Sequence, residues 1–182
     1  MIISVENTGW PAKFTHVLKP FSRSASQIIA VISSDLPVQI QENSATFFMD
    51  GIFIGLQEFC FIGREKKLFL GSDPLVFAEV KMLSKPNEIA EIDEGKQKWN
   101  WHWRTHVKNE SGNEVNVMIE EPIPQIRDRR IKYEVRGEPA FSEEQPLGSR
   151  KLVMAPRSEC AFETFVNIEA QKDLNLEMTW TP

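Results

Sequence analysis

The chain has 182 residues, of which 41% are apolar and 26% charged, and its formal net charge is −5. This ordinary globular composition argues against disorder, and the acidic balance argues against nucleic acid as a partner. No apolar run approaches the roughly 18 residues of a membrane-spanning helix, and the start MIISVENTGW lacks the basic and apolar segments of a signal peptide, so we expect no membrane insertion and no signal peptide on this chain.

The first half of the chain predicts short strands separated by turn residues. The candidate strands are residues 2–6, 12–18, 27–33, 38–41, 45–49, 51–61, 67–70 and 76–83. Asp50-Gly51 lies between two apolar segments and predicts a tight hairpin turn. The polar residues 84–98 predict a long loop.

The clearest strand follows this loop. Its odd positions are Trp99, Trp101, Trp103, Thr105 and Val107, and its even positions are Asn100, His102, Arg104, His106 and Lys108. One apolar and one polar face are typical of a half-buried antiparallel strand. The turn at 109–114 then predicts a hairpin with residues 115–120.

The remaining segments predict more strands. Two prolines within residues 121–124 end the second strand of the hairpin. Residues 131–136, 151–155, 159–170 and 174–180 alternate again, and residues 137–149 read as a loop. We therefore expect an all-β fold, an antiparallel β-sandwich whose immunoglobulin-like part spans residues 76–182 and packs on a second β region at 1–75. Residues 72–74, rich in turn formers, set this boundary.

Cysteine and histidine spacing predicts no metal site and no cofactor. The two cysteines, Cys60 and Cys160, lie among apolar residues, and we interpret them as buried reduced thiols, with a disulfide left open. His102 and His106 lie four residues apart on a strand, about 13 Å, which is too far for one zinc ion. The third histidine is His16.

Two rows of side chains on the tryptophan strand allow a functional interpretation. Trp99, Trp101 and Trp103 could form a sugar-stacking platform, but the apolar residues that continue their face favour core packing. The row His102, Arg104, His106 on the other face is solvated or covers a partner.

Charged clusters have simple interpretations. The run RDRR (residues 127–130) could hold a phosphate or a carboxylate, but local pairing with Asp128, Glu120 and Glu121 explains it without a ligand. The acidic residues Glu91, Asp93, Glu94, Glu143 and Glu144 lack the calcium-loop pattern. No nucleophile elbow, dinucleotide fingerprint or phosphate loop occurs, so we assign no catalytic residue and expect no enzyme.

Several segments resemble the C-terminal domain of the mucoidy inhibitor A family, a bacterial domain without assigned function. The similar segments are FFMDGIFIGLQEF (47–59), REKKLFLGSDPLVFAEVKML (64–83), WHWRTHVKNESGNEVNVMIEEPIPQIRDRRIKYEV (101–135) and LVMAPRSECAFETFVNIEA (152–170). Arg157 replaces the family's turn glycine, and no segment of this sequence resembles the family's N-terminal domain or coiled-coil section, so we expect either a short relative or an excised domain. The resemblance implies a β-sandwich and the bacterial cell envelope, and no catalytic residue.

Two hypotheses follow. The first is a non-catalytic interaction or structural module that binds a protein partner or further domains of a larger assembly. The alternative is a carbohydrate-binding or glycan-processing protein that uses exposed aromatic residues and a carboxylate pair.

Overall fold

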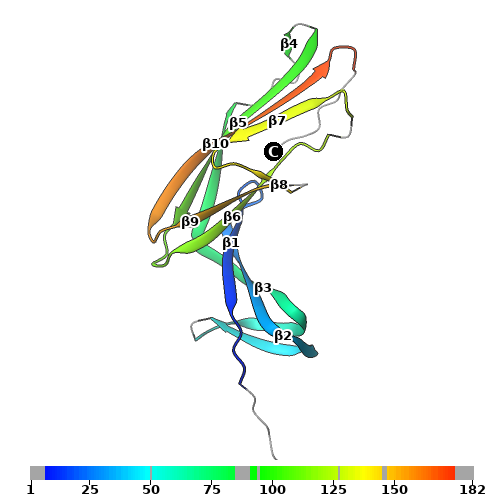
Figure 1. Cartoon of the computed structure of the whole chain (residues 1–182). Coiled ribbons are helices and arrows are strands. Elements are labelled where there is room, and N and C mark those ends of the chain that lie inside the picture. Colours follow the sequence, from blue (N-terminus) through cyan, green and yellow to red (C-terminus); the bar gives the residue numbers. More distant parts are fainter. Residues whose placement is uncertain are drawn as a thin grey trace, which may run out of the picture. The chain divides into compact units, whose positions relative to one another are not determined.

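The regular structure of the chain is entirely β in the part that is described. The computed structural model describes residues 7–49, 51–84, 91–93, 95–126, 128–144 and 147–174 (Figure 1). Its strands are β1 (Ala12–Lys19), β2 (Arg23–Met49), β3 (Ile52–Ser84), β4 (Glu91–Asp93), β5 (Lys96–Asn109), β6 (Val115–Pro122), β7 (Lys132–Gly137), β8 (Ser142–Glu144), β9 (Leu147–Met154) and β10 (Ser158–Gln171). The all-β prediction is confirmed. The candidate strand at residues 2–6, and that at 174–180 except for its first residue, lie outside the described residues.

Two strands are much longer than the sequence predicts. β2 joins three predicted strands and contains Pro37, and β3 joins three more and contains Pro74. Both prolines are exposed. Proline has no N–H to donate to a neighbouring strand, so it interrupts a strand only where that hydrogen bond is required. At an exposed position the strand can continue through it. Between the two strands, Gly51 takes a positive φ of 79°, as a tight turn requires, while Asp50 lies outside the described residues.

The two predicted loops also contain short strands. β4 lies within the expected loop 84–98 and pairs with β5. β8 and the beginning of β9 lie within the expected loop 137–149 and pair with each other. Segments of three residues are too short for alternation to be visible in the sequence.

The strand order differs from that of an immunoglobulin-like sandwich. Hydrogen-bonded neighbours follow the order β7-β10-β5-β3-β2-β1-β6-β9-β8 in one mixed sheet, which does not separate into the two sheets expected. β1 and β6 pair in parallel, with Val17 opposite Met118. Alternation is the same in parallel and antiparallel strands, so the sequence could not show this pairing.

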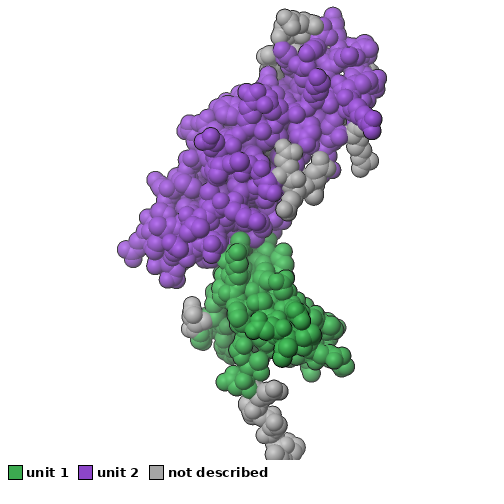
Figure 2. All heavy atoms as spheres, in the orientation of Figure 1, with its two compact units in different colours: residues 1–15, 27–72 green, residues 16–26, 73–182 purple. Residues whose placement is uncertain are grey.

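The chain forms two compact units (Figure 2). The first comprises residues 1–15 and 27–72, and the second comprises residues 16–26 and 73–182. The division at 72/73 lies within the turn-forming residues 72–74, but β3 continues through it. Residues 16–26 belong to the second unit, whereas the sequence assigned them to the first.

The first unit has a small apolar core of its own. Ile28, Ala30 and Ile32 alternate inward along β2. Phe61 is fully buried, and its ring meets that of Trp10 edge to face at 5.4 Å between centroids. These contacts account for a compact unit made mainly of one long hairpin.

The second unit contains two adjoining apolar clusters. One joins β1, β3, β5, β6, β9 and β10 through Leu18, Val76, Ala78, Val107, Val115, Val117, Ile119, Met154 and Phe162. The other joins Trp99, Trp101 and Trp103 of β5 to Val166, Ile168 and Ala170 of β10. β5 and β10 contribute side chains to both clusters and so connect them.

Candidate functional site

The tryptophans of β5 lie inside the second unit. Trp99, Trp101 and Trp103 are 4%, 3% and 0% exposed. The ring of Phe21 meets that of Trp103 edge to face at 5.4 Å. The core interpretation is confirmed, and a sugar platform built from these residues is wrong.

The polar row of β5 faces outward and is paired with acids of β10. β10 runs antiparallel to β5 with Phe165 opposite His102 and Glu163 opposite Arg104. Glu163 accepts hydrogen bonds from Arg104 Nη2 at 2.6 Å and from His102 Nε2 at 2.7 Å. His106 Nε2 lies 3.3 Å from Glu159 Oε2. The row is thus an outward ion-pair ladder.

These contacts fix the charge of Glu163. The hydrogen bond from Arg104, and then that from His102, lower the pKa of the Glu163 carboxyl group. Glu163 is therefore a carboxylate at neutral pH, and both of its oxygens already accept hydrogen bonds.

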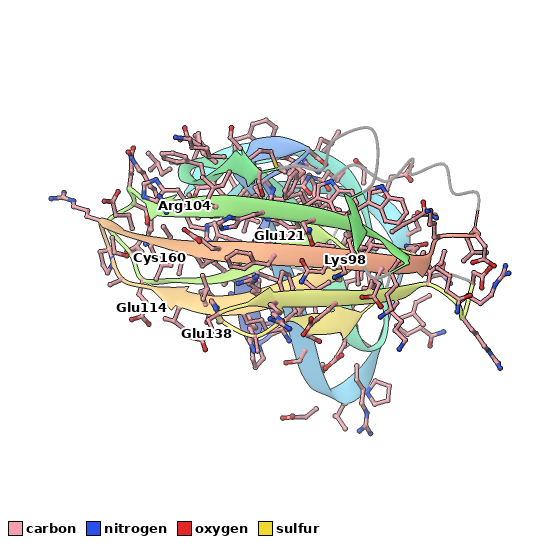
Figure 3. All side chains as sticks on the ribbon, turned by 90° about the horizontal axis from the view of Figure 1, so that it is seen from above. Lys98, Arg104, Glu114, Glu121, Glu138 and Cys160 are labelled. Atoms are coloured by element: carbon pink, nitrogen blue, oxygen red, sulfur yellow. The ribbon has the colours of Figure 1, made fainter. Side chains whose placement is uncertain are left out.

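A cleft of about 860 Å³ lies beside this ladder. Among the described residues it is lined by Val135, Arg136, Gly137, Glu138, Ala140, Phe141, Glu163, Phe165 and Asn167. The volume falls within the range of small-molecule sites. The lining comes from β7, from β10 and from the segment that follows β7, where Figure 3 places Glu138. We call it the β7–β10 cleft.

An aromatic ring forms part of this cleft. The Phe165 ring stacks on the His102 imidazole with 4.0 Å between centroids and 18° between planes. Phe165 remains 39% exposed. Because His102 covers one face of the ring, the exposure belongs to the other face and the edges.

A buried polar network lies inside the second unit. Glu121 is fully buried, and Figure 3 shows it among the strands. Its Oε1 accepts hydrogen bonds from Trp103 Nε1 at 3.2 Å and Thr105 Oγ1 at 2.5 Å, and its Oε2 accepts one from Thr164 Oγ1 at 3.1 Å. Three neutral donors thus stabilise a buried carboxylate.

Arg150 is the cation of this network. Its Nη2 donates to Thr164 Oγ1 at 2.8 Å, and its Nε lies 3.6 Å from Glu121 Oε2, an ion-pair distance without a hydrogen bond. Its guanidinium carbon lies 3.7 Å and 4.5 Å from the ring centroids of Phe141 and Phe162. Desolvation by burial lowers the pKa of Arg150, opposed by the charge of Glu121.

The charged run after β6 is partly described. The Arg130 side chain donates hydrogen bonds from Nε and Nη2 to both oxygens of Asp128, which confirms local pairing for these two residues and lowers the pKa of the Asp128 carboxyl group to about 2. Among the described residues Glu120 and Glu121 pair elsewhere, and Arg127 lies outside the described part. Glu120 pairs with Lys19 at 2.7 Å, and Glu121 points inward because the strand alternates.

Other residues singled out in the sequence have ordinary roles or lie outside the described part. Cys60 and Cys160 are free, as expected for reduced thiols, but they are half-buried, so the expectation that they are buried is wrong. Lys66 Nζ donates to Cys60 Sγ at 3.3 Å. His16 Nε2 lies 3.1 Å from Asp73 Oδ2. The side chains of Glu91, Asp93, Glu94, Glu143 and Glu144 are not described.

An exposed apolar surface lies at the end of the β2–β3 hairpin in the first unit. Phe48, Met49, Ile52 and Phe53 are 63%, 37%, 73% and 61% exposed, and we call these four residues the hairpin tip. The rings of Phe48 and Phe53 meet edge to face at 5.9 Å. Leu56 is also 67% exposed.

Sequence reasoning missed both the hairpin tip and the exposed Phe165 ring of the β7–β10 cleft. In FFMDGIF, apolar residues occupy both faces of the hairpin next to the turn, so one face has no core to enter. In β10, Phe165 is the one aromatic residue on a face that is otherwise polar apart from Ala161. Each departure from alternation was visible in the sequence.

Within the described ranges, no group of three or more His, Cys, Asp or Glu side chains is arranged to hold a metal ion. No helix there is long and apolar enough to cross a membrane.

Comparisons with known proteins give a family. No curated protein and no solved structure matches the chain. The family comparison matches residues 3–172 and names no function, so the resemblance to the mucoidy inhibitor A family stays a prediction. Because the match covers nearly the whole chain, the protein belongs to the DUF4139 family, described as a domain of unknown function.

Proposed function

We propose that the protein is a non-catalytic interaction module that docks on an apolar groove of a partner protein through its hairpin tip. The observation that carries this proposal is the exposure of Phe48, Met49, Ile52 and Phe53 next to one tight turn. Large apolar residues gathered on a surface are typical of interaction sites.

The size of the tip supports a specific contact. Taking about 200 Å² for each large side chain, the four exposed fractions correspond to roughly 450 Å² of accessible surface. One side of a standard protein–protein interface buries about 800 Å². The tip would therefore supply the apolar centre of such an interface, with neighbouring residues as its rim.

The charge of the tip favours a protein over a membrane surface. Residues 45–57 contain Asp50 as their only charged residue and no Lys or Arg. Segments that bind anionic lipid combine apolar residues with Lys and Arg, because the cations are attracted to the headgroups. A tip without cations fits an uncharged groove in a protein. The edge-to-face pair of Phe48 and Phe53 holds two of the rings in place before binding, which lowers the entropy cost.

The experiment places a photo-cross-linking phenylalanine analogue at position 48 in the protein's native host. The matched position is Val153, which is 65% exposed on β9 of the second unit. We expect a defined protein adduct from position 48 and none from position 153. The adduct should map to an apolar segment of the partner, and it should be lost when Ile52→Ser is added.

The binding is then measured with the identified segment and the purified protein. Ile52→Ser should weaken it at least about tenfold, which corresponds to ~1.4 kcal/mol, and Val153→Ser should leave it unchanged. Equal adducts at both positions, or adducts with lipid alone, would refute the proposal.

The resemblance to the mucoidy inhibitor A family adds the cell envelope as the proposed setting. Fractionation of the native host tests this part separately. Recovery of the protein in the envelope fraction supports it, and recovery elsewhere contradicts it without affecting the docking proposal.

A further inference from the structure

The charges that line the β7–β10 cleft are largely compensated by neighbours. Glu163 accepts hydrogen bonds from Arg104 and His102, and Arg136 Nε donates to Glu134 Oε1 at 2.6 Å. Glu138 is the remaining charged residue of the lining. The cleft therefore offers little net charge to an ionic ligand, and an anion would meet the Glu138 carboxylate.

The groups that remain available are neutral or hydrogen-bonding. Asn167 and Glu138 make no side-chain hydrogen bond or ion pair with another described residue. An amide supplies both donors and acceptors, and a carboxylate accepts up to four hydrogen bonds. Together they suit a ligand that carries many hydroxyl groups.

The Phe165 ring supplies the apolar part of the site. His102 stacks on one face and holds the ring in place, while the residue as a whole remains 39% exposed. The face of an aromatic ring is electron-rich and attracts weakly positive C–H groups. Pyranose rings present such C–H groups on one face and hydroxyl groups around the rim.

We propose that the β7–β10 cleft binds a neutral oligosaccharide. Phe165 stacks against a sugar ring, and Asn167 and Glu138 bind its hydroxyl groups. The cleft and the hairpin tip belong to different units, so this site does not depend on the proposed docking function. It differs from the tryptophan platform considered from the sequence, since it uses the outward face of β10 instead of the inward face of β5.

The test uses isothermal titration of the full chain with four probes: maltohexaose, cellohexaose, chitohexaose and the cationic peptide pentalysine. We expect at least one hexasaccharide to bind at concentrations up to about 10 mM, the weak end of the affinity scale for small ligands. Phe165→Ala should weaken this binding about tenfold, and Asn167→Ala should weaken it as well.

The matched control is Phe69→Ala, because Phe69 is a phenylalanine of similar exposure, 46%, in the first unit. Phe69→Ala should leave sugar binding unchanged, and thermal melts should show that all variants are folded. Since Phe165 lies on the surface, Phe165→Leu provides a second variant that keeps apolar volume and loses only the aromatic face.

Three results would overturn the proposal. The first is that none of the three hexasaccharides binds. The second is that pentalysine binds and no sugar does, which would assign the cleft to a basic peptide. The third is that folded Phe165→Ala and Phe165→Leu bind sugar as tightly as the unchanged protein.

Discussion

The buried pair of Glu121 and Arg150 allows a quantitative test of the core. Both side chains are fully buried, and among the described residues neither pairs with another side chain of opposite charge. Glu121→Gln keeps an acceptor for Trp103 and Thr105 but removes the negative charge. The guanidinium of Arg150 then stays buried without an anion, a change that typically costs about 3–5 kcal/mol of unfolding free energy.

This cost should be visible in urea unfolding followed by tryptophan fluorescence, since Trp103 donates directly to Glu121. With a slope of about 2 kcal/mol per molar urea, the midpoint should fall by about 2 M. The matched control is Glu120→Gln on the same strand. Glu120 pairs with Lys19 at a partly exposed site, so its loss should cost no more than about 1 kcal/mol.

A double-mutant cycle isolates the pair itself. Arg150→Met removes the cation, and in Glu121→Gln/Arg150→Met neither charge remains buried. We expect the double variant to be more stable than the sum of the two single losses predicts, by about 2 kcal/mol or more. The reasoning is refuted if the two losses are additive, or if Glu121→Gln costs no more than Glu120→Gln.

Three further predictions concern the second unit. Trp101→Ala should cost about 3–5 kcal/mol and lower the melting temperature strongly, while His102→Ala on the outward face should cost no more than about 1 kcal/mol; equal melts would contradict the inward and outward assignment. Gly137→Ala should lower the urea midpoint, because its Cβ would lie 2.4 Å from the buried guanidinium and 2.7 Å from a backbone oxygen, whereas Gly112→Ala has nothing within 4 Å; a Gly137→Ala protein of unchanged stability would show that this contact relaxes freely. Burial raises the pKa of the Cys160 thiol above its ordinary value of 9.0, so in a variant that lacks Cys60 the rate of alkylation by iodoacetamide should reach half its maximum above pH 9, and a midpoint below pH 9 would count against this burial.

The parts of the fold that depend on alternation could be predicted from the sequence. Among the described residues, each predicted strand from Lys96 onward that alternates over six residues or more is present, the candidate at 174–180 being untested, and the buried side of β5 is the tryptophan side. Burial of every second residue is a local property, because successive side chains point to opposite faces of the sheet. The sequence therefore carries it directly.

The parts that depend on distant pairing could not be predicted. The position of β1 beside β6 joins residues about a hundred positions apart, and nothing in AKFTHVLK distinguishes this partner from any other strand. The same holds for the buried pair. Glu121 and Arg150 look like surface charges in the sequence, and only the register of β6 with β9, which sets Ile119 opposite Arg150, turns them toward one interior.

The candidate site could be predicted only in part. The polar row of β5 was recognised, but its pairing with Glu163 and Glu159 required the register of β10. Phe165 was treated as one more residue of an alternating strand. A single exposed aromatic residue is common on protein surfaces, so the sequence alone could not separate it from the background.

The parallel pairing of β1 with β6 has a consequence for biosynthesis. Residues 16–18 contact residues 117–119, so this ladder cannot close until more than half of the chain has left the ribosome. Closing a loop of about a hundred residues is entropically costly, and non-local pairings of this kind slow folding. The first unit, whose residues 27–72 interrupt the second, has all of its own chain available earlier. We therefore expect the β2–β3 hairpin to acquire structure during translation while the edge of β1 that pairs with β6 stays open, and in nascent chains halted before residue 117 β1 should be more accessible to protease than in the complete chain.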